Sequence, residues 1–209
     1  MTERIYTENR HHEPKARLAA LKHLIGTPLR VLEIGVWEGR STCWLLETIL
    51  THPESILITV DPFEYNQRPA TSEENEELRI YKEGHFDLGP IVETRFYTNL
   101  GELAKKVIHH KKSSDQFFAD RGQPQYDIVI VDGAHNAFQV AKDLLNSWQF
   151  LKPGGILIAD DYGWTGHFDV WKCNGPRRAL DAFMSIIPGD DYEVLFKDWI
   201  IIFRKKFGA

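Results

Sequence analysis

The sequence has 209 residues, of which 43% are hydrophobic, and its formal net charge at pH 7 is −5. This length and hydrophobic content suit one compact domain over residues 1–209 with a sizeable core. The negative charge gives no overall attraction for nucleic acid or for an anionic membrane surface, so the expected partner is a small molecule. Two cysteines without metal-type spacing and a polar N-terminus lead us to expect a cytoplasmic protein.

Residues 1–28 are expected to form an N-terminal helical extension. Apolar residues recur at helical spacing from Leu18 to Ile25, and a Gly-Thr-Pro segment then ends the helix. His11 and His12 precede this helix in a polar segment, where a pair of histidines is most often solvated. We therefore expect no role for these two residues.

A glycine-rich turn follows the first predicted strand. The residues from Gly35 to Gly39 read Gly-Val-Trp-Glu-Gly, and Glu33 stands two positions before them. Glycines let the backbone approach a ligand closely, and Ser41 lies near the amino end of the next helix, where free N–H groups point outward. The pattern favours a nucleotide-like cofactor, and a tight turn without a ligand is the alternative.

The spacing of this turn resembles motif I of the class I S-adenosylmethionine-dependent methyltransferases. It reads acid-x-Gly-x-x-x-Gly and lacks the third glycine of the dinucleotide fingerprint. On this resemblance, Glu33, Gly35, Gly39 and Ser41 are candidate cofactor-binding residues. Trp37 could face the sulfonium of S-adenosylmethionine, but an aromatic residue in this turn is equally expected to pack in the core.

The next two strands supply further candidates for cofactor binding. The strand over residues 56–60 ends at Asp61, which is placed to bind ribose hydroxyls, unless it only ends the strand in a turn. A third strand, around residues 94–98, is expected to end at Asn99 and Leu100, which would contact the adenine in the methyltransferase interpretation.

Two connecting segments accompany these strands. After the third predicted strand, residues 103–108 are expected to form a helix. Between the second and third strands, the polar residues 64–89 are expected to contain a helix near residues 72–81. Whether they form a lid is left open.

Three acidic residues follow two further strands. Short apolar runs at 128–131 and 156–159 flank a helical pattern, which predicts a βαβ unit. Asp132, Asp160 and Asp161 then all lie beyond the carboxyl ends of parallel strands, where such sheets bind ligands. Clustered acids repel one another unless a cation binds, and oxygen ligands favour Mg²⁺ first, then Mn²⁺ or Ca²⁺.

The sequence around these acids resembles the metal-dependent O-methyltransferases that modify sugars of macrolide and aminocoumarin antibiotics. The resemblance rests on Asp132-Gly-Ala-His135, on the Leu-Lys-Pro-Gly-Gly turn at 151–155, and on Asp160-Asp161-Tyr162. It implies that Asp132, Asp160 and Asp161 bind Mg²⁺, and that His135, together with Asp132, is catalytic. His135 would be the base. The alternative for His135 is a first-turn helix residue packed on the end of the sheet.

The rest of the chain agrees with this family. Pro176 is expected to open a helix, in whose first turn Arg177 and Arg178 either meet a substrate anion or have no role. Residues 192–196 and 199–203 are expected to form an antiparallel hairpin. The implied fold class is α/β: a doubly wound, Rossmann-like methyltransferase fold with a mostly parallel seven-stranded sheet and an antiparallel C-terminal hairpin.

The predicted function is Mg²⁺-dependent methyl transfer from S-adenosylmethionine to a hydroxyl of a small molecule. The acceptor is left open among a sugar, a catechol-like phenol and another vicinal oxygen compound, and so is assembly into a homo-oligomer. One alternative is a non-catalytic module that binds S-adenosylmethionine. The other is a nicotinamide-dependent oxidoreductase. Its fingerprint would contain the third glycine, and its chemistry does not require three clustered acids.

Overall fold

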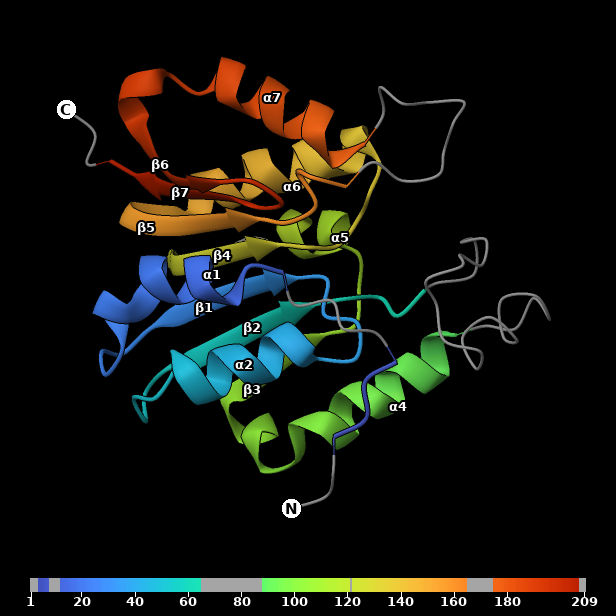
Figure 1. Cartoon of the computed structure of the whole chain (residues 1–209). Helices are drawn as coiled ribbons and strands as arrows, with labels where there is room; N and C mark the ends of the chain where they lie inside the picture. Colours follow the sequence, from blue (N-terminus) through green and yellow to red (C-terminus); the bar gives the residue numbers. More distant parts are fainter. Residues whose placement is uncertain (1–3, 8–11, 65–87, 121, 165–174, 207–209) are drawn as a thin grey trace.

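The computed structural model describes residues 4–7, 12–64, 88–120, 122–164 and 175–206. Within them, seven strands form one sheet in the order β3-β2-β1-β4-β5-β7-β6 (Figure 1). Strands β1 to β5 are parallel, whereas β7 runs antiparallel to both β5 and β6. The predicted α/β fold with an antiparallel C-terminal hairpin is confirmed. The strands are β1 (Arg30–Ile34), β2 (Ile56–Val60), β3 (Val107–His110), β4 (Tyr126–Val131), β5 (Leu151–Ala159), β6 (Tyr192–Lys197) and β7 (Ile201–Lys205).

Helices cover both faces of the sheet (Figure 1). One face carries α1 (Pro14–Leu21), α2 (Arg40–Thr48) and α4 (Gly89–Leu100), and the other carries α5 (Ser114–Ala119), α6 (Ala137–Phe150) and α7 (Pro176–Ile186). Short 3₁₀ turns are η1 (Lys22–Leu24), η2 (Gly101–Lys106) and η4 (Gly189–Asp191). None of the described helices has the length and apolar character needed to cross a membrane.

Strand β4 illustrates how the sheet separates two cores. Ile128 and Ile130 pack in the core beneath α1, α2 and α4, whereas Val129 and Val131 pack beneath α5, α6 and α7. Because both faces are covered, the strand is a continuous apolar run. The predicted βαβ unit is confirmed as β4, α6 and β5, and the two strands end level, with Val131 opposite Ala159.

The predicted third strand at residues 94–98 is wrong, because these residues belong to helix α4. Val92, Phe96 and Leu100 are buried at helical spacing, and Pro90 stands in the first turn, where proline is favoured. The third strand is instead β3, which begins at Val107 in the last two residues of the helix predicted over 103–108. The predicted helix near 72–81 and most of the segment considered as a lid lie outside the described residues.

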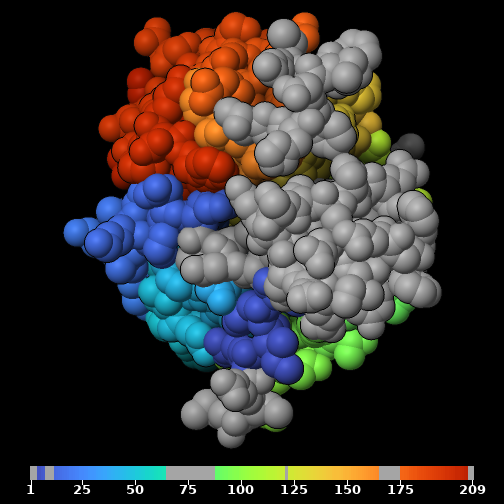
Figure 2. Space-filling view, turned by 45° about the vertical axis from the view of Figure 1, so that its right-hand side comes forward, coloured from blue at the N-terminus to red at the C-terminus, as the bar shows by residue number. Residues whose placement is uncertain are grey.

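The N-terminal extension packs against segments that are distant in the sequence. The predicted helix is confirmed as α1 and η1, but its buried side differs: Arg17 is 1% exposed, whereas Leu18 and Ile25 are 39% and 41% exposed. Residues 4–7, drawn dark blue in Figure 2, lie between α2 (cyan) and α4 (green). The same view shows the blue residues that follow position 12 against the C-terminal region drawn red.

Candidate functional site

The turns after β1, β4 and β5 start side by side at the carboxyl edge of the sheet. Asp132 donates its N–H to the carbonyl of Ile34 at 2.8 Å, and Asp160 donates its N–H to the carbonyl of Val131 at 3.0 Å. These bonds extend the strand pairing by one residue. Since the strand order reverses between β1 and β4, the acids stand at the crevice where open α/β sheets bind ligands.

The glycine-rich turn, residues 35–39, is packed directly against the turn after β4. Gly35 has a φ of 83°, and a Cβ at this position would lie 2.2 Å from the carbonyl oxygen of Asp132. Gly39 precedes α2 with a φ of 81°, and a Cβ there would lie 3.0 Å from the ring of Phe96. Gly35 is therefore required by the protein's own packing, whereas at Gly39 the positive φ and a close ring both favour glycine. Trp37, between them, also has a positive φ, of 49°.

Glu33 is a fully buried acid beneath this turn. Its Oε2 accepts a hydrogen bond from the Thr42 hydroxyl at 2.7 Å. Burial raises the pKa of Glu33 to about 7, and the bond from Thr42 and the neighbouring Ser41 hydroxyl lower it only in part. The predicted acid thus lies in β1 and contacts the first turn of α2, to which Ser41 belongs.

Asp61 is buried directly after β2 and accepts a hydrogen bond from the glycine-rich turn. One oxygen accepts from the N–H of Val36 at 2.9 Å, and the other accepts from the N–H of Phe63 at 2.8 Å. Phe63 has a φ of 54°, which these contacts help to hold. The predicted ribose contact stays a prediction, and the observed role of Asp61 is to fix two backbone segments.

Asn99 and Leu100 do not follow a strand, so the basis for predicting adenine contacts there is wrong. Both stand at the carboxyl end of α4, where Leu100 is buried in the core. The Asn99 amide donates to the carbonyls of Glu38 at 2.9 Å and Ile5 at 2.8 Å, and it accepts from the Ile5 N–H at 2.8 Å. Asn99 therefore joins the N-terminal residues to the glycine-rich turn.

Glu38 is a residue of this turn that the sequence analysis did not select. Its buried carboxylate accepts from the Thr7 N–H at 2.6 Å, from the Thr7 hydroxyl at 2.9 Å and from the Arg95 guanidinium at 2.9 Å. The turn is thus tied both to the N-terminal residues and to α4. An acid between two glycines was the available signal, but its partners are too distant in sequence to be identified.

The second part of the site is the acid pair, Asp160 and Asp161, which is buried beyond β5. The Arg17 guanidinium contacts Oδ2 of Asp160 at 2.5 Å, while Nδ1 of His12 lies 3.2 Å from Oδ1. The N–H of Asp161 donates to the same Oδ1 at 2.7 Å. Although burial opposes it, the bond with His12 and the charge of Arg17 leave the pKa of Asp160 below its usual value.

Asp132 is electrostatically coupled to the acid pair. The pKa of Asp132 is raised well above its usual value. Desolvation by the surrounding protein is the largest cause, and the charges of Asp160 and Asp161 add to it. The prediction that all three acids follow the carboxyl ends of neighbouring parallel strands is confirmed. Among the described residues, the group whose ligand atoms all lie within 4.8 Å of one another is His12, Asp160 and Asp161. Metal binding by Asp132, which is outside that group, stays a prediction.

His135 lies against the acid pair from the side of α6. Its Nε2 is 2.7 Å from Oδ2 of Asp161, and its ring centroid is 4.8 Å from that of Trp164. The alternative that placed it in the first turn of a helix is wrong, because α6 begins at Ala137 and Asn136 caps it by accepting from Gln139. His135 is thus held by an acid and an aromatic ring just outside the helix.

The expectation that His12 has no role is wrong, and Arg17 was not selected at all. His12 contacts Asp160 across 148 positions of the sequence, and Arg17 does so across 143. Spacing within the sequence cannot reveal such contacts. One signal was present for Arg17, because it stands at helical spacing from Leu21 on the side of α1 that faces the core. His11 lies outside the described residues.

Arg177 is engaged by the residue that follows the acid pair. Its guanidinium lies 4.9 Å from the ring centroid of Tyr162, and its Nε donates to the Tyr162 carbonyl at 3.1 Å. The predicted start of a helix at Pro176 is confirmed in α7. A contact between Arg177 or Arg178 and substrate stays a prediction.

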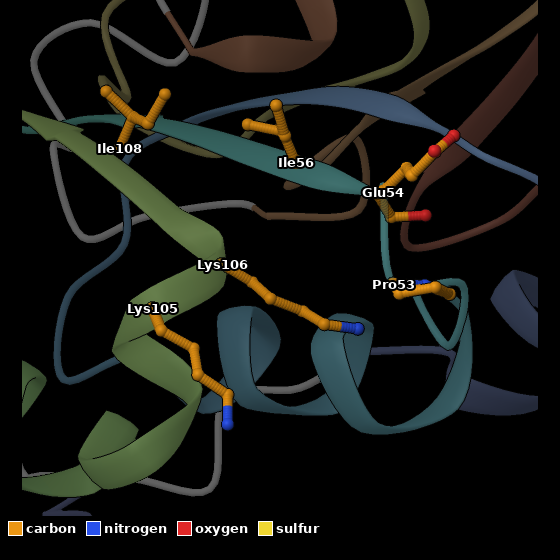
Figure 3. A pocket seen from close by; sticks show the side chains of 7 residues that line it. Pro53, Glu54, Ile56, Lys105, Lys106 and Ile108 are labelled. Atoms are coloured by element: carbon orange, nitrogen blue, oxygen red, sulfur yellow. The ribbon is translucent and has the colours of Figure 1, made fainter.

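A separate cavity of about 380 Å³ lies at the opposite edge of the sheet, where β2 begins (Figure 3). It is lined by Ile56 and Ile108, with Lys105 and Lys106 on one side. The Lys106 amine donates to the carbonyls of Leu50 at 2.8 Å and His52 at 3.2 Å. The cavity is far along β2 from Asp61, so the acids and the glycine-rich turn do not contribute to it.

Solved structures with this fold include several O-methyltransferases. TomG from Streptomyces achromogenes, an enzyme of tomaymycin synthesis in complex with SAM, is 17% identical, with a TM-score of 0.59 over 93% of this chain and 80% of that chain. An O-methyltransferase from Bacillus cereus in complex with SAH is 17% identical, with a TM-score of 0.57 over 96% and 84%. Cofactor-bound Rv0187 from MTB is 16% identical, with a TM-score of 0.63 over 97% and 84%.

These likenesses establish the fold, and the sequence itself establishes the family. No curated protein is similar enough in sequence to count as a match. A family model described as a methyltransferase domain matches residues 32–162, which include the glycine-rich turn, Asp61, all three acids and His135. Since this match covers more than half of the chain, the protein belongs to the methyltransferase domain family.

Proposed function

We propose that this protein transfers the methyl group of S-adenosylmethionine to a hydroxyl oxygen of a small molecule, with a divalent metal ion bound at the acids. The observation that carries the proposal is the packing of the glycine-rich turn against the turn that bears Asp132, beside the acid pair. The SAM and SAH complexes of the two O-methyltransferases with this fold support the choice of cofactor.

The glycine-rich turn would hold the cofactor, which supplies an electrophilic methyl group on sulfur. Gly35 and Gly39 let this turn pack closely against Asp132 and Phe96, and Glu33 and Ser41 are buried beside it. Asp61 would bind the ribose. A carboxylate oxygen has two lone pairs, so the backbone bonds of Asp61 do not prevent it from accepting hydrogen bonds from hydroxyls.

The donors beyond β5 fit a divalent metal ion. His12, Asp160 and Asp161 offer ligand atoms within 4.8 Å of one another, and Asp132 is close enough for the charges of Asp160 and Asp161 to help raise its pKa. Carboxylate oxygens favour Mg²⁺, then Mn²⁺ or Ca²⁺. When bound, such an ion lowers the pKa of an acceptor hydroxyl and offsets the repulsion among the acids.

His135 would accept the proton of the acceptor hydroxyl. If its Nε2–H is donated to Asp161, Nδ1 is the nitrogen whose lone pair takes the proton. Asp161 fixes the tautomer, and Trp164 packs on the ring and limits its rotation. The arrangement is that of a general base oriented by a carboxylate.

The acceptor is proposed to be a small molecule such as a sugar, a catechol-like phenol or another compound with vicinal oxygens. The formal charge of −5 supports this class over nucleic acid or a membrane surface. The proposed location is the cytoplasm, which the two cysteines without metal-type spacing support. A base held against an acid is most useful for an aliphatic hydroxyl, because a catechol already ionises more easily.

The test combines calorimetry with a methyl-release assay on a panel of hydroxyl compounds. We expect S-adenosylmethionine, and not NADH, to bind, and we expect methylation to stop in excess chelator and to resume with Mg²⁺ or Mn²⁺. Binding without turnover on any acceptor would leave a cofactor-binding module. Full activity in excess chelator would remove the metal from the mechanism.

The role of His135 has a separate test. His135→Gln should lower kcat by about 10²–10⁴ on an aliphatic acceptor, with little change in the affinity for S-adenosylmethionine, because a positioned proton acceptor is lost. The pH–rate profile should also lose its acidic limb. A wild-type rate with an unchanged pH profile would mean that another group takes the proton.

A further inference from the structure

His12 is held beside the acid pair by its ring and by its backbone. The ring centroid lies 4.9 Å from that of Trp199, and Nδ1 lies 3.2 Å from Oδ1 of Asp160. The His12 carbonyl accepts from Nε of Arg17 at 2.9 Å, while the same guanidinium contacts Asp160. The imidazole is therefore held beside the buried Asp160 by contacts of its ring and of the His12 backbone.

The ligand atoms of His12, Asp160 and Asp161 could share one ion. All three lie within 4.8 Å of one another. Two ligands of one ion, each about 2.0–2.4 Å from it, can be no more than about twice that distance apart. The three separations are therefore those of a single coordination shell.

The charges around this group suit a divalent cation. Arg17 occupies Oδ2 of Asp160, which leaves Oδ1 on the side of His12. The carboxylates of Asp160 and Asp161, opposed by the Arg17 guanidinium, carry a formal charge of −1. A divalent cation would offset this charge and the repulsion between the two acids, and an imidazole must be neutral to bind it.

From these contacts we infer that His12 is a metal ligand, so that the ion is bound by one imidazole nitrogen together with the carboxylates of Asp160 and Asp161. The inference rests on the metal-dependent function proposed above and changes the expected ion. Imidazole suits first-row transition metals better than Mg²⁺ or Ca²⁺. The site therefore prefers Mn²⁺ to Mg²⁺, and the N-terminal segment supplies part of the metal centre.

The experiment measures Mn²⁺ bound to the full chain. Binding affinity is obtained by electron paramagnetic resonance of free Mn²⁺, and coordination by electron spin-echo modulation, which detects an imidazole ¹⁴N on the ion. We expect ¹⁴N modulation in the wild type, replaced by ¹⁵N modulation after labelling with ¹⁵N-histidine. His12→Gln should remove the signal and weaken Mn²⁺ binding at least tenfold, with a smaller effect on Mg²⁺ competition.

Two other histidines serve as controls. His23→Gln changes an exposed histidine of the same N-terminal region and should keep both the nitrogen signal and the affinity. His135→Gln should also keep the nitrogen signal, because His135 contacts Asp161 from outside the group of three ligand atoms. Loss of the signal in His135→Gln, with its retention in His12→Gln, would assign the nitrogen to His135 and overturn the inference.

The remaining outcomes separate this inference from the proposed function. Tight Mn²⁺ binding without nitrogen modulation in the wild type would overturn the role of His12, yet chelator-sensitive methylation would keep the proposed function. Absence of Mn²⁺ binding would overturn the inference, whereas the metal requirement of the proposed function would still be decided by methylation in excess chelator. If His12→Gln does not fold, the wild-type spectrum still shows whether a histidine nitrogen binds the ion, and His135→Gln shows whether that nitrogen belongs to His135.

Discussion

The two parts of the site are held together by different forces. Around the glycine-rich turn, close packing and hydrogen bonds to backbone groups dominate, as where Asp61 accepts from Val36 and Phe63. Around the acid pair, ionisable groups face one another, as where Arg17 contacts Asp160. The first part depends mainly on shape, although the buried carboxylate of Glu38 also pairs with Arg95. The second depends on charge, so its stability follows protonation and bound cations.

The contrast between the two parts of the site would not hold if the protein tolerated a side chain at position 35. Gly35→Ala should destabilise the fold by about 5 kcal/mol or more, because its Cβ would lie 2.2 Å from a backbone oxygen that has little room to move. The measurement is urea unfolding of the chain without ligand. Loss of stability there would show that the glycine is required by packing as well as by any cofactor.

Gly26→Ala is the matched control for this substitution. Gly26 has nearly the same φ, 82°, but no atom lies within 4 Å of a Cβ built there. Its substitution should cost only about 1 kcal/mol, which is the strain of a positive φ. Equal effects of the two alanines would mean that backbone conformation, and not the contact with Asp132, decides the stability of Gly35.

The charged part is tested by removing Arg17. Arg17→Met should cost about 3–5 kcal/mol near neutral pH, because it leaves the buried carboxylate of Asp160 without its cation. Asp160 has a lowered pKa in the folded state, so the ion pair stabilises above the unfolded pKa of ~3.9. That stabilisation should disappear as pH falls through the folded value.

Two variants sharpen this result. Lys15→Met changes an exposed cation of the same helix and should alter stability by no more than about 0.5 kcal/mol. Adding Asp160→Asn to Arg17→Met should recover part of the loss, because the unpaired charge is removed. Additive effects of the two substitutions would argue against a direct ion pair.

Glu33 belongs to the part around the glycine-rich turn, and its protonation should make the stability of that part depend on pH. Burial raises its pKa to about 7, so the folded state holds a proton that the unfolded state releases near pH ~4.3. Its contribution to stability is therefore present below the unfolded value and declines as pH rises through the folded value. Glu33→Gln should flatten this decline and add about 2 kcal/mol of stability at about pH 8. Unfolding curves between about pH 5 and 8 would measure it.

The smallest expected effect concerns the N-terminal residues. Thr7→Val removes the hydroxyl that donates to Glu38 at 2.9 Å and keeps the backbone N–H bond to the same carboxylate. The cost should be about 1.5 kcal/mol, at the lower end for one hydrogen bond to a charged group, because the backbone bond to the buried Glu38 remains. Thr27→Val changes an exposed hydroxyl that donates to the Leu24 carbonyl and should cost less. A larger loss for Thr27→Val would mean that Thr7 does not support the glycine-rich turn.

The parts of the fold that were predictable are those with strong local patterns. The unit of β4, α6 and β5 has two short apolar runs around a helical repeat, and the acids follow the strands by direct succession in the sequence. Part of helix α4 was predicted to be a strand, because its threonines and aromatic residues are typical of strands. Thr94 and Thr98 are accommodated in the helix by donating to the carbonyls of Pro90 and Thr94.

The parts of the site that were not predictable depend on contacts between distant segments. Asp132, Asp160 and Asp161 could be brought together from the rule that parallel strands share one carboxyl edge. No such rule relates His12 or Arg17 to that edge, because the position of α1 follows from packing on the finished sheet. Composition could place Arg17 on a helix but could not name the carboxylate that it meets.

The contact between Arg17 and Asp160 also bears on how the chain folds during synthesis. Arg17 emerges from the ribosome 143 residues before its partner, and β5 must be in place before the buried pair can form. Until then the guanidinium is best kept hydrated, which disfavours early burial of α1. The N-terminal helix is therefore expected to dock late, although it is translated first, and its docking completes the site only when most of the sheet exists.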